Sequence, residues 1–322
     1  MSPRISEAEE MARGLTRKVG RAIQEYRMIE SGDRILVAVS GGKDSYTLLD
    51  LLERLRRRSP VRFELTACNV DQGYNGFRSD VIEDHLKSAG HRYHIEVTEI
   101  AHTIRKKMDP DDTHCSLCAR LRRGVLYRLA TELGCNKIAL GHHADDIIET
   151  LLMLQLFNGQ IKTMPPVLRA ENGLHTVIRP MVTVWEREVI DYTRAMKFPV
   201  VCCCCPACGD TSLQRRRIKD LLARLETEHP GIKTSLLKAT RNVHLGFLMD
   251  PRYLPGPHSG GGEQPARAAT PDAARGAAAG DRLDAAPVGE VQKAAAQRDD
   301  EALSCAAPPE AAAGEVPSFS ST

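Results

Sequence analysis

A short glycine-containing loop, Ser40-Gly41-Gly42-Lys43-Asp44-Ser45, constrains the fold of this chain more than any other stretch. An apolar, β-branched run at 35–39 precedes it, as in a parallel strand that is buried on both faces. Leucines with helical spacing follow it from Leu48 to Leu55. A glycine pair at such a junction lets backbone N–H groups and the helix N-terminus face an anion, while the lysine adds charge and the serines add hydroxyl groups. The loop therefore predicts a phosphate-binding site in an α/β fold.

Two common phosphate-binding motifs are excluded by their spacing. A Walker loop needs a glycine five residues before its Gly-Lys pair and a Ser or Thr directly after it, and Val37 and Asp44 occupy those positions. The dinucleotide fingerprint needs a third glycine, which is missing at its spacing. A tight turn without any ligand is the structural alternative.

Strand and helix patterns alternate along the first 200 residues. Apolar runs at 63–70, 91–97 and 137–140 predict further strands, and helical patterns separate them, which favours a doubly wound, mainly parallel sheet. We expect residues 98–114 to form a connection, 157–184 to form turns with a hairpin between Val167 and Ile178, and 234–249 to form a last helix.

Polar residues follow two of the predicted strands. Asp71 ends the run at 63–70, and His143, Asp145 and Asp146 follow the run at 137–140, directly before a helical pattern. The carboxyl ends of parallel strands meet at one sheet edge, where open α/β folds bind ligands. Carboxylates there suit Mg²⁺ and ATP, whereas turn formation for the first aspartate and helix capping for the others are the structural alternatives.

Two Cys-x-x-Cys pairs lie about 90 residues apart. They are Cys115 with Cys118 and Cys205 with Cys208, and further cysteines fill positions 202–204. Two such pairs favour a shared metal centre, but thiolates suit both structural zinc and an iron–sulfur cluster. Cys68 and Cys135 fall in apolar runs and are expected to pack in the core.

Composition divides the chain into a basic folded part and an acidic tail. Residues 255–322 hold five basic and ten acidic residues and few large apolar ones, so we expect a disordered tail. With a net charge of +2 for the chain, the rest carries about +7, which suits a polyanionic partner. We divide the chain into a helical segment (1–30), a nucleotide-binding domain (31–200), a segment with the second cysteine pair (201–254) and the tail. Without a run of roughly 20 apolar residues we expect no membrane contact and a cytoplasmic location.

The loop and the later motifs together resemble those of a known family. The strand-Ser-Gly-Gly-Lys-Asp-Ser-helix unit is similar to the PP-loop of N-type ATP pyrophosphatases, which have an adenine nucleotide alpha hydrolase-like fold. Together with Gly-His-His-x-Asp-Asp from Gly141 and two cysteine pairs before Arg-rich helices, it resembles the bacterial tRNA 2-thiocytidine synthetases over about residues 1–250. In that family three cysteines hold a 4Fe-4S cluster. They map to Cys115, Cys118 and Cys205, with Cys208 as the alternative third ligand.

The resemblance implies an ATP-dependent tRNA sulfurtransferase acting on C2 of cytidine 32. ATP with Mg²⁺ would adenylate the C2 oxygen, and sulfur from a cysteine desulfurase, carried on the open cluster iron, would replace it. Lys43 and Asp44 are expected to be catalytic, and the other implied ATP contacts are Ser40, Gly41, Gly42, Ser45, Asp71, His143 and Asp145. Candidate RNA contacts, or merely solvated charges, are Arg120, Arg122, Arg123, Arg215, Arg216 and Arg217.

A homodimer is a further expectation that the resemblance carries. Three alternatives remain for the function. They are a uridine thiolase or a lysidine-type ligase on the same scaffold, and a zinc-stabilised, nucleotide-gated RNA-binding module.

Overall fold

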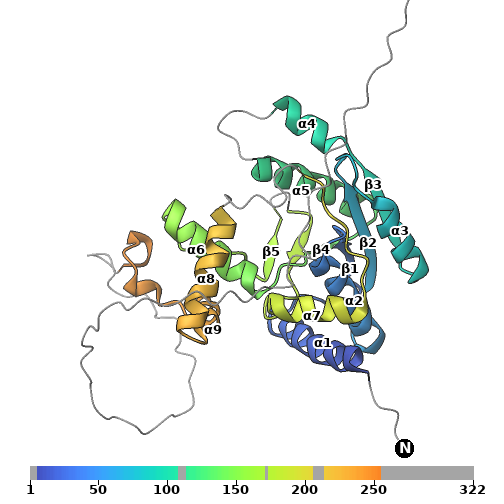
Figure 1. Cartoon of the computed structure of the whole chain (residues 1–322). Coiled ribbons are helices and arrows are strands. Elements are labelled where there is room, and N and C mark those ends of the chain that lie inside the picture. The colour runs from blue at the N-terminus through green and yellow to red at the C-terminus, as the bar shows by residue number, and fades with distance from the viewer. Residues whose placement is uncertain (1–5, 108–113, 171–172, 206–213, 255–322) are drawn as a thin grey trace, which may run out of the picture. The chain divides into compact units, whose positions relative to one another are not determined.

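The computed structural model describes residues 6–107, 114–170, 173–205 and 214–254, with the side chains of 114–116 excluded. Within unit 1, which includes the described residues up to Arg241, helices surround one sheet. The elements are α1 (Glu7–Glu25), β1 (Arg34–Ala38), α2 (Lys43–Arg58), β2 (Glu64–Asp71), α3 (Ser79–Ser88), β3 (Tyr93–Val97), α4 (Ile100–Lys107), α5 (His114–Glu132), β4 (Lys137–Ala139), α6 (Ala144–Asn158), β5 (Val167–Arg169), β6 (Thr176–Ile178), α7 (Glu186–Met196), α8 (Gln214–Glu228) and α9 (Ile232–Ala239) (Figure 1).

The sheet has the order β3-β2-β1-β4-β6-β5 and is parallel except for β5. This confirms the predicted fold class. The strand β1 lies inside the sheet, and the chain proceeds from it first toward β2 and later to β4 on its other side. The order of the strands therefore reverses beside β1, and a ligand crevice is expected at the carboxyl end of that strand, where the glycine loop begins. The predicted hairpin is present, because Val167 pairs with Ile178 in antiparallel register.

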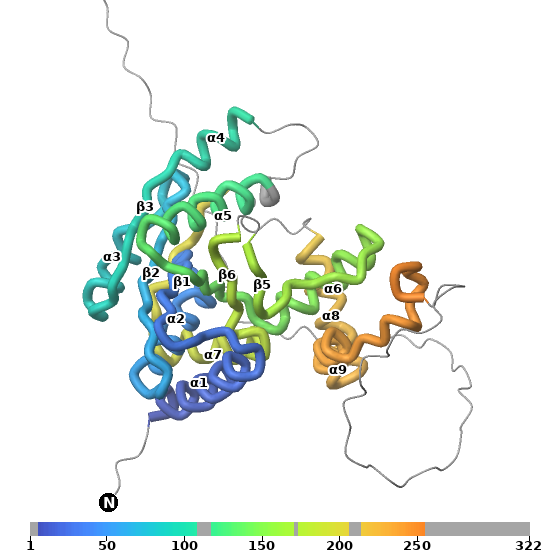
Figure 2. The backbone as a smooth tube through the Cα atoms, turned by 180° about the vertical axis from the view of Figure 1, so that it is seen from behind, coloured from blue at the N-terminus to red at the C-terminus, as the bar shows by residue number. Residues whose placement is uncertain are grey.

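Alternate side chains of β1 enter two cores on opposite faces of the sheet. Ile35 and Val37 pack in the larger core, to which the apolar sides of α1, α2, α3 and α7 contribute. Leu36 enters a smaller core beneath α5, together with Cys68 and Cys135. Both cysteines are buried there, which confirms that they are packing residues. In the view from behind, α1, α2 and α7 lie beside one another, and α5 lies apart from them, above this group (Figure 2).

Two predictions about helices are wrong. Residues 98–114 are more than a connection, because α4 forms within them; Ile100 and Ile104, one turn apart, are buried against Leu117 and Cys118. The last helix ends at Ala239 instead of continuing to 249. The apolar residues beyond it are exposed, with Phe247 90% accessible, so no buried face supports a longer helix.

The described residues after Arg241, 242–254, belong to a second unit. They form two short 3-10 turns, η1 (Leu245–Phe247) and η2 (Pro251–Tyr253). Across the described parts of both units, no helix combines the length and the apolar character needed to span a membrane. The predicted tail, 255–322, lies outside the described residues.

Candidate active site

The glycine loop joins β1 to α2 as the sequence predicted, and its two serines hold it in shape. The backbone N–H of Ser40 donates to Ser45 Oγ (3.2 Å), and that hydroxyl donates to the Gly42 carbonyl (2.8 Å). The Gly42 N–H donates to Ser40 Oγ (3.3 Å), and Gly42 is also the N-cap of α2. The start of α2, with its unpaired N–H groups and partial positive charge, is thus preorganised for an anion.

Gly41 has to be glycine for two reasons. Its φ of +84° lies in the left-handed region, and a Cβ atom there would come within 2.2 Å of Val201 Cγ2 and 2.8 Å of Ile82 Cδ1. The N–H of Val201 also donates to the Gly41 carbonyl (3.0 Å). The segment that leads into the cysteine run is therefore packed directly against the loop.

The second motif meets the loop through another glycine. A Cβ atom on Gly141 would lie 3.0 Å from the Asp44 carbonyl oxygen, so the strand-end loop after β4 approaches the first turn of α2 closely. His143 follows as the N-cap of α6 and forms a reciprocal capping box with Asp146. Its Nε2 lies 3.6 Å from Asp44 Oδ1. The capping interpretation is correct for this pair, and the same residues also face the loop.

Lys43 is held between two carboxylates, one of which the sequence did not indicate. Its Nζ lies 3.3 Å from Asp44 Oδ2 and 3.2 Å from Glu186 Oε1, at the start of α7. Burial alone would lower the pKa of Lys43, but the two carboxylates outweigh burial and raise it. Burial likewise favours a higher pKa for Glu186, yet Lys43 and Lys219 hold that pKa at about 2. The site therefore keeps Lys43 charged.

Asp44 carries an oxygen suited to a cation. Asp44 Oδ1 is buried and accepts no hydrogen bond within the described chain, and burial raises the pKa of this carboxyl. An unsatisfied carboxylate oxygen beside Asp146 suits the preference of Mg²⁺ for oxygen ligands.

Asp145 and Asp71, two of the predicted ATP contacts, bind other residues of the chain. Asp145 accepts the Glu186 N–H (2.7 Å) and pairs with Lys233 (3.0 Å). Asp71 accepts the Gly73 N–H (2.8 Å) and the Ser79 hydroxyl (3.1 Å), so its two oxygens serve a turn.

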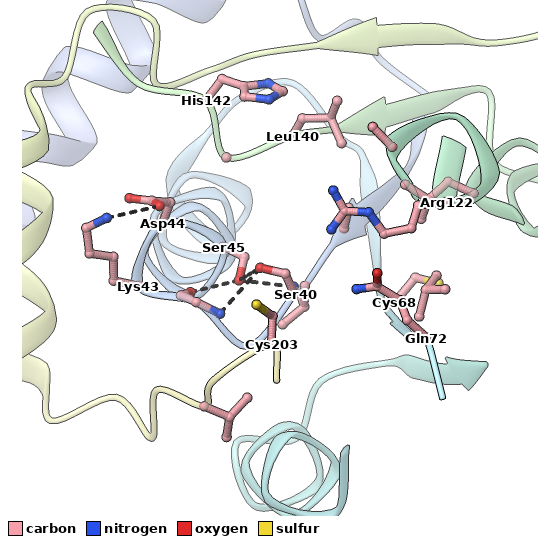
Figure 3. Close-up of a pocket in the computed structure, with 18 of the residues that line it drawn as sticks. Ser40, Lys43, Asp44, Ser45, Cys68, Gln72, Arg122, Leu140, His142 and Cys203 are labelled. Carbon is pink, nitrogen blue, oxygen red and sulfur yellow. Dashed lines mark hydrogen bonds and ion pairs between the residues drawn. The ribbon is translucent and has the colours of Figure 1, made fainter. Parts of the chain in front are cut away.

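A cavity of about 540 Å³ opens over the loop (Figure 3). Loop residues line one side of it, and Arg122, Arg123, His142 and Cys203 line other parts. A smaller hollow of about 280 Å³ is also lined by Lys43 and includes Arg215 and Arg216. Of the predicted arginines, Arg120 and Arg217 line neither space.

Three of the described cysteines, Cys118, Cys203 and Cys205, lie near Tyr74. Burial, followed by the nearby sulfur groups of Cys118, Cys205 and Cys203, raises the pKa of Tyr74 to about 12. Cys203 and Cys205 have their sulfur atoms 3.4 Å apart, and Cys118 Sγ donates to Gln72 Oε1 (2.8 Å).

The backbone of Cys115 lies in the first turn of α5, but its side chain and the whole of Cys208 lie outside the described residues. Among the side chains that are described, no group of three metal-binding residues is assembled. The thiols near Tyr74, of which Cys203 lines the cavity, nevertheless fit an iron–sulfur cluster, whose usual ligands are thiolates.

Comparison with known proteins decides the family. A profile of the PP-loop domain matches residues 11–223. The tRNA-cytidine(32) 2-sulfurtransferase of Geotalea uraniireducens is 57% identical over 73% of this chain and 93% of its own length. The chain belongs to the tRNA-cytidine(32) 2-sulfurtransferases. A second such sulfurtransferase, from Geobacter metallireducens, is 55% identical over 75% of this chain and 94% of its own.

Among solved structures, this sulfurtransferase is similar to the U34-tRNA thiolase NcsA from Methanococcus maripaludis, which was determined with its 4Fe-4S cluster. The TM-score is 0.61 at 23% identity, over 73% of this chain and 79% of that one. The likeness supports the mainly parallel α/β fold that the strand order shows.

Proposed function

We propose that this chain thiolates C2 of cytidine 32 in tRNA at the expense of ATP. The observation that carries the proposal is its 57% identity to a tRNA-cytidine(32) 2-sulfurtransferase over 93% of that protein's length. The geometry supports this proposal, because the glycine loop and Cys203 line the same cavity.

The loop activates an oxygen that would otherwise not leave. The C2 oxygen of cytidine attacks the α-phosphorus of ATP, the bond from that phosphorus to the bridging oxygen breaks, and pyrophosphate leaves. Lys43 and the N–H groups at the start of α2 stabilise the charge that develops on the departing phosphates. A hydrosulfide-level sulfur, released from a desulfurase persulfide when a second thiol reduces the persulfide and forms a disulfide, then attacks C2. The bond from C2 to the original oxygen breaks, and AMP leaves with that oxygen.

Magnesium and the cluster have distinct residues in this scheme. Asp44, through its unsatisfied oxygen, and Asp146 are the proposed Mg²⁺ ligands. Cys115, Cys118 and Cys205, with Cys208 as the alternative third ligand, hold the 4Fe-4S cluster. When bound, a cluster with three protein ligands supplies an iron open to sulfur. Gln72 orients one of these thiols, because it accepts a hydrogen bond from Cys118 Sγ. Tyr74 lies near the same group of thiols.

Arginines around the cavity and the smaller hollow provide positive charge that suits tRNA. Arg122 and Arg123 line the cavity, Arg215 and Arg216 line the adjacent hollow, and a flipped-out loop base is the form of RNA that side chains read. A cysteine desulfurase as sulfur donor, a homodimer and a cytoplasmic location complete the proposal.

Nucleoside analysis of tRNA from a deletion strain tests the substrate. We expect 2-thiocytidine to disappear and to return with the wild-type gene; unchanged 2-thiocytidine would overturn the proposal. Loss of 2-thiouridine or lysidine instead would identify one of the alternative reactions. A protein that holds stoichiometric zinc but neither iron nor acid-labile sulfide after anaerobic reconstitution would refute the cluster.

A further inference from the structure

A buried arginine without a carboxylate partner lies directly behind the cavity. Arg179, the residue after β6, is 7% exposed, and its Nη1 donates to the Pro165 carbonyl (2.7 Å). Its Nε donates to Nδ1 of His142 (3.2 Å). Within the described parts of the chain no carboxylate pairs with this guanidinium, and burial, with Arg123 adding to it, lowers the pKa of Arg179. Burying an uncompensated cation is costly, so its position calls for a function.

The contact dictates the state of the histidine. A guanidinium has only donors, so Nδ1 of His142 must be the acceptor, and the ring proton must reside on Nε2. His142 lines the cavity (Figure 3), and its Nε2 makes no hydrogen bond to any described residue. Burial is the main cause that lowers the pKa of His142 to about 4, so the ring is neutral at ordinary pH. The titratable and charged groups around it are Asp146, Arg179, Arg215 and His143, and Arg122 and Arg123 line the same cavity.

We infer that Arg179 is a positioning residue that holds His142 as a neutral Nε2–H donor for an oxygen of the ATP α-phosphate. The inference deepens the proposed function and rests on it. The loop takes the two phosphates that leave as pyrophosphate, so the α-phosphate lies next along the cavity. Because Gly141 touches the backbone of Asp44, the following residue, His142, borders that place. A donor of fixed tautomer needs no reorganisation when charge develops on the phosphate.

The first experiment reads the tautomer directly, without any turnover. The full chain is labelled with ¹⁵N at histidine, and long-range ¹H–¹⁵N spectra are recorded from pH 5 to 8, with His142→Gln assigning the signal. We expect a neutral ring with its proton on Nε2 across this range. Arg179→Met should remove the hydrogen bond that fixes the tautomer, so the pKa of His142 should rise and both tautomers should be populated. Arg179→Lys keeps a cationic donor and should largely preserve the Nε2–H tautomer. A wild-type ring that carries its proton on Nδ1, or that is charged at pH 7, would overturn the inference.

The second experiment measures tRNA-dependent pyrophosphate release from ATP. We expect Arg179→Met to lower kcat about tenfold with little change in the KM for ATP, and to add a loss below pH 7 that the wild type lacks. His142→Phe should cost about 10- to 100-fold, and the double variant should cost no more than His142→Phe alone, since the arginine acts through the histidine. Arg169→Met is the matched control, because Arg169 is exposed and, among the described residues, its side chain donates only to the Gly173 carbonyl.

The outcomes separate the two proposals. Additive losses in the double variant would mean that Arg179 acts structurally and would overturn the inference. Unchanged 2-thiocytidine in the deletion strain would overturn the proposed function, while the tautomer measured by NMR would still stand. If Arg179→Met fails to fold, Arg179→Lys and His142→Gln still decide: both should retain most of the activity, because both keep a donor in place.

Discussion

Replacing Gly41 with alanine should destabilise the protein far more than the same replacement of a typical loop glycine. The left-handed conformation at φ +84° costs an alanine about 1–2 kcal/mol. The overlap of its Cβ with Val201 Cγ2 at 2.2 Å and Ile82 Cδ1 at 2.8 Å adds about 1–3 kcal/mol of overpacking. The expected loss is therefore about 2–5 kcal/mol in the free energy of unfolding, a large share of the about 5–15 kcal/mol typical of a domain.

Urea unfolding of four variants, Gly41→Ala, Gly90→Ala, Val201→Ala and the double variant at positions 41 and 201, separates the two contributions. Gly90→Ala is the matched control, because Gly90 has a φ of +71° but a Cβ atom at that position would meet no other atom within 4 Å, so only the conformational cost of about 1–2 kcal/mol applies. Val201→Ala removes the atom that overlaps most and should lower the cost of Gly41→Ala toward that of the control, with the Ile82 overlap remaining. Equal losses for Gly41→Ala and Gly90→Ala in the wild-type background would refute the close approach of the loop and the cysteine segment.

Three further predictions concern the site. Lys43→Ala should slow pyrophosphate release about 100- to 1,000-fold and leave the iron content unchanged; an active variant would contradict the role of the lysine. Burial raises the pKa of Glu149 to about 7, so the folded state binds the proton of this carboxyl more tightly than the unfolded state does. The resulting contribution to the free energy of unfolding is fully present below about pH 4.5 and is lost as the pH rises toward 7. Glu149→Gln should therefore gain up to about 3 kcal/mol at pH 8 relative to pH 4 in urea unfolding, whereas the exposed Glu228→Gln should not; parallel pH profiles would refute this. Cys118→Ser should lose iron after anaerobic reconstitution, while Cys135→Ser should keep it and lose only stability; equal iron contents would argue against a ligand role for Cys118.

The fold could be predicted because its signals are local. The run before Ser40 reads as a buried strand, and the leucines after Ser45 read as a helix, so the loop between them is specified by adjacent residues. The hairpin at Val167 has its own turn signal in the same way. The helix α4 was missed because its apolar face consists of only Ile100, Ala101 and Ile104, beside a stretch with strong turn signals.

The partners of the site residues could not be predicted, because contacts distant in sequence create them. Nothing near Glu186 indicates that it pairs with Lys43, since the two come together only when α7 packs against α2. Arg179 depends in the same way on the approach of β6 to the loop that carries His142. The role of Asp71 was left undecided, and its hydrogen bonds to Gly73 and Ser79 favour the turn. Local spacing identifies the groups that carry the chemistry, whereas packing decides their charge and orientation.

The contact between Gly41 and Val201 makes nucleotide activation and sulfur delivery structurally dependent on each other. The Gly41 carbonyl accepts the Val201 N–H, and the Val201 side chain occupies the space that a side chain at position 41 would need. Only one residue separates Val201 from Cys203, which lines the cavity and lies 3.4 Å from the sulfur of Cys205. A shift of the loop backbone must therefore move the cysteine segment or break a hydrogen bond. The glycine is thus required for two sites at once, because it shapes the phosphate loop and sets where the thiols stand relative to the nucleotide.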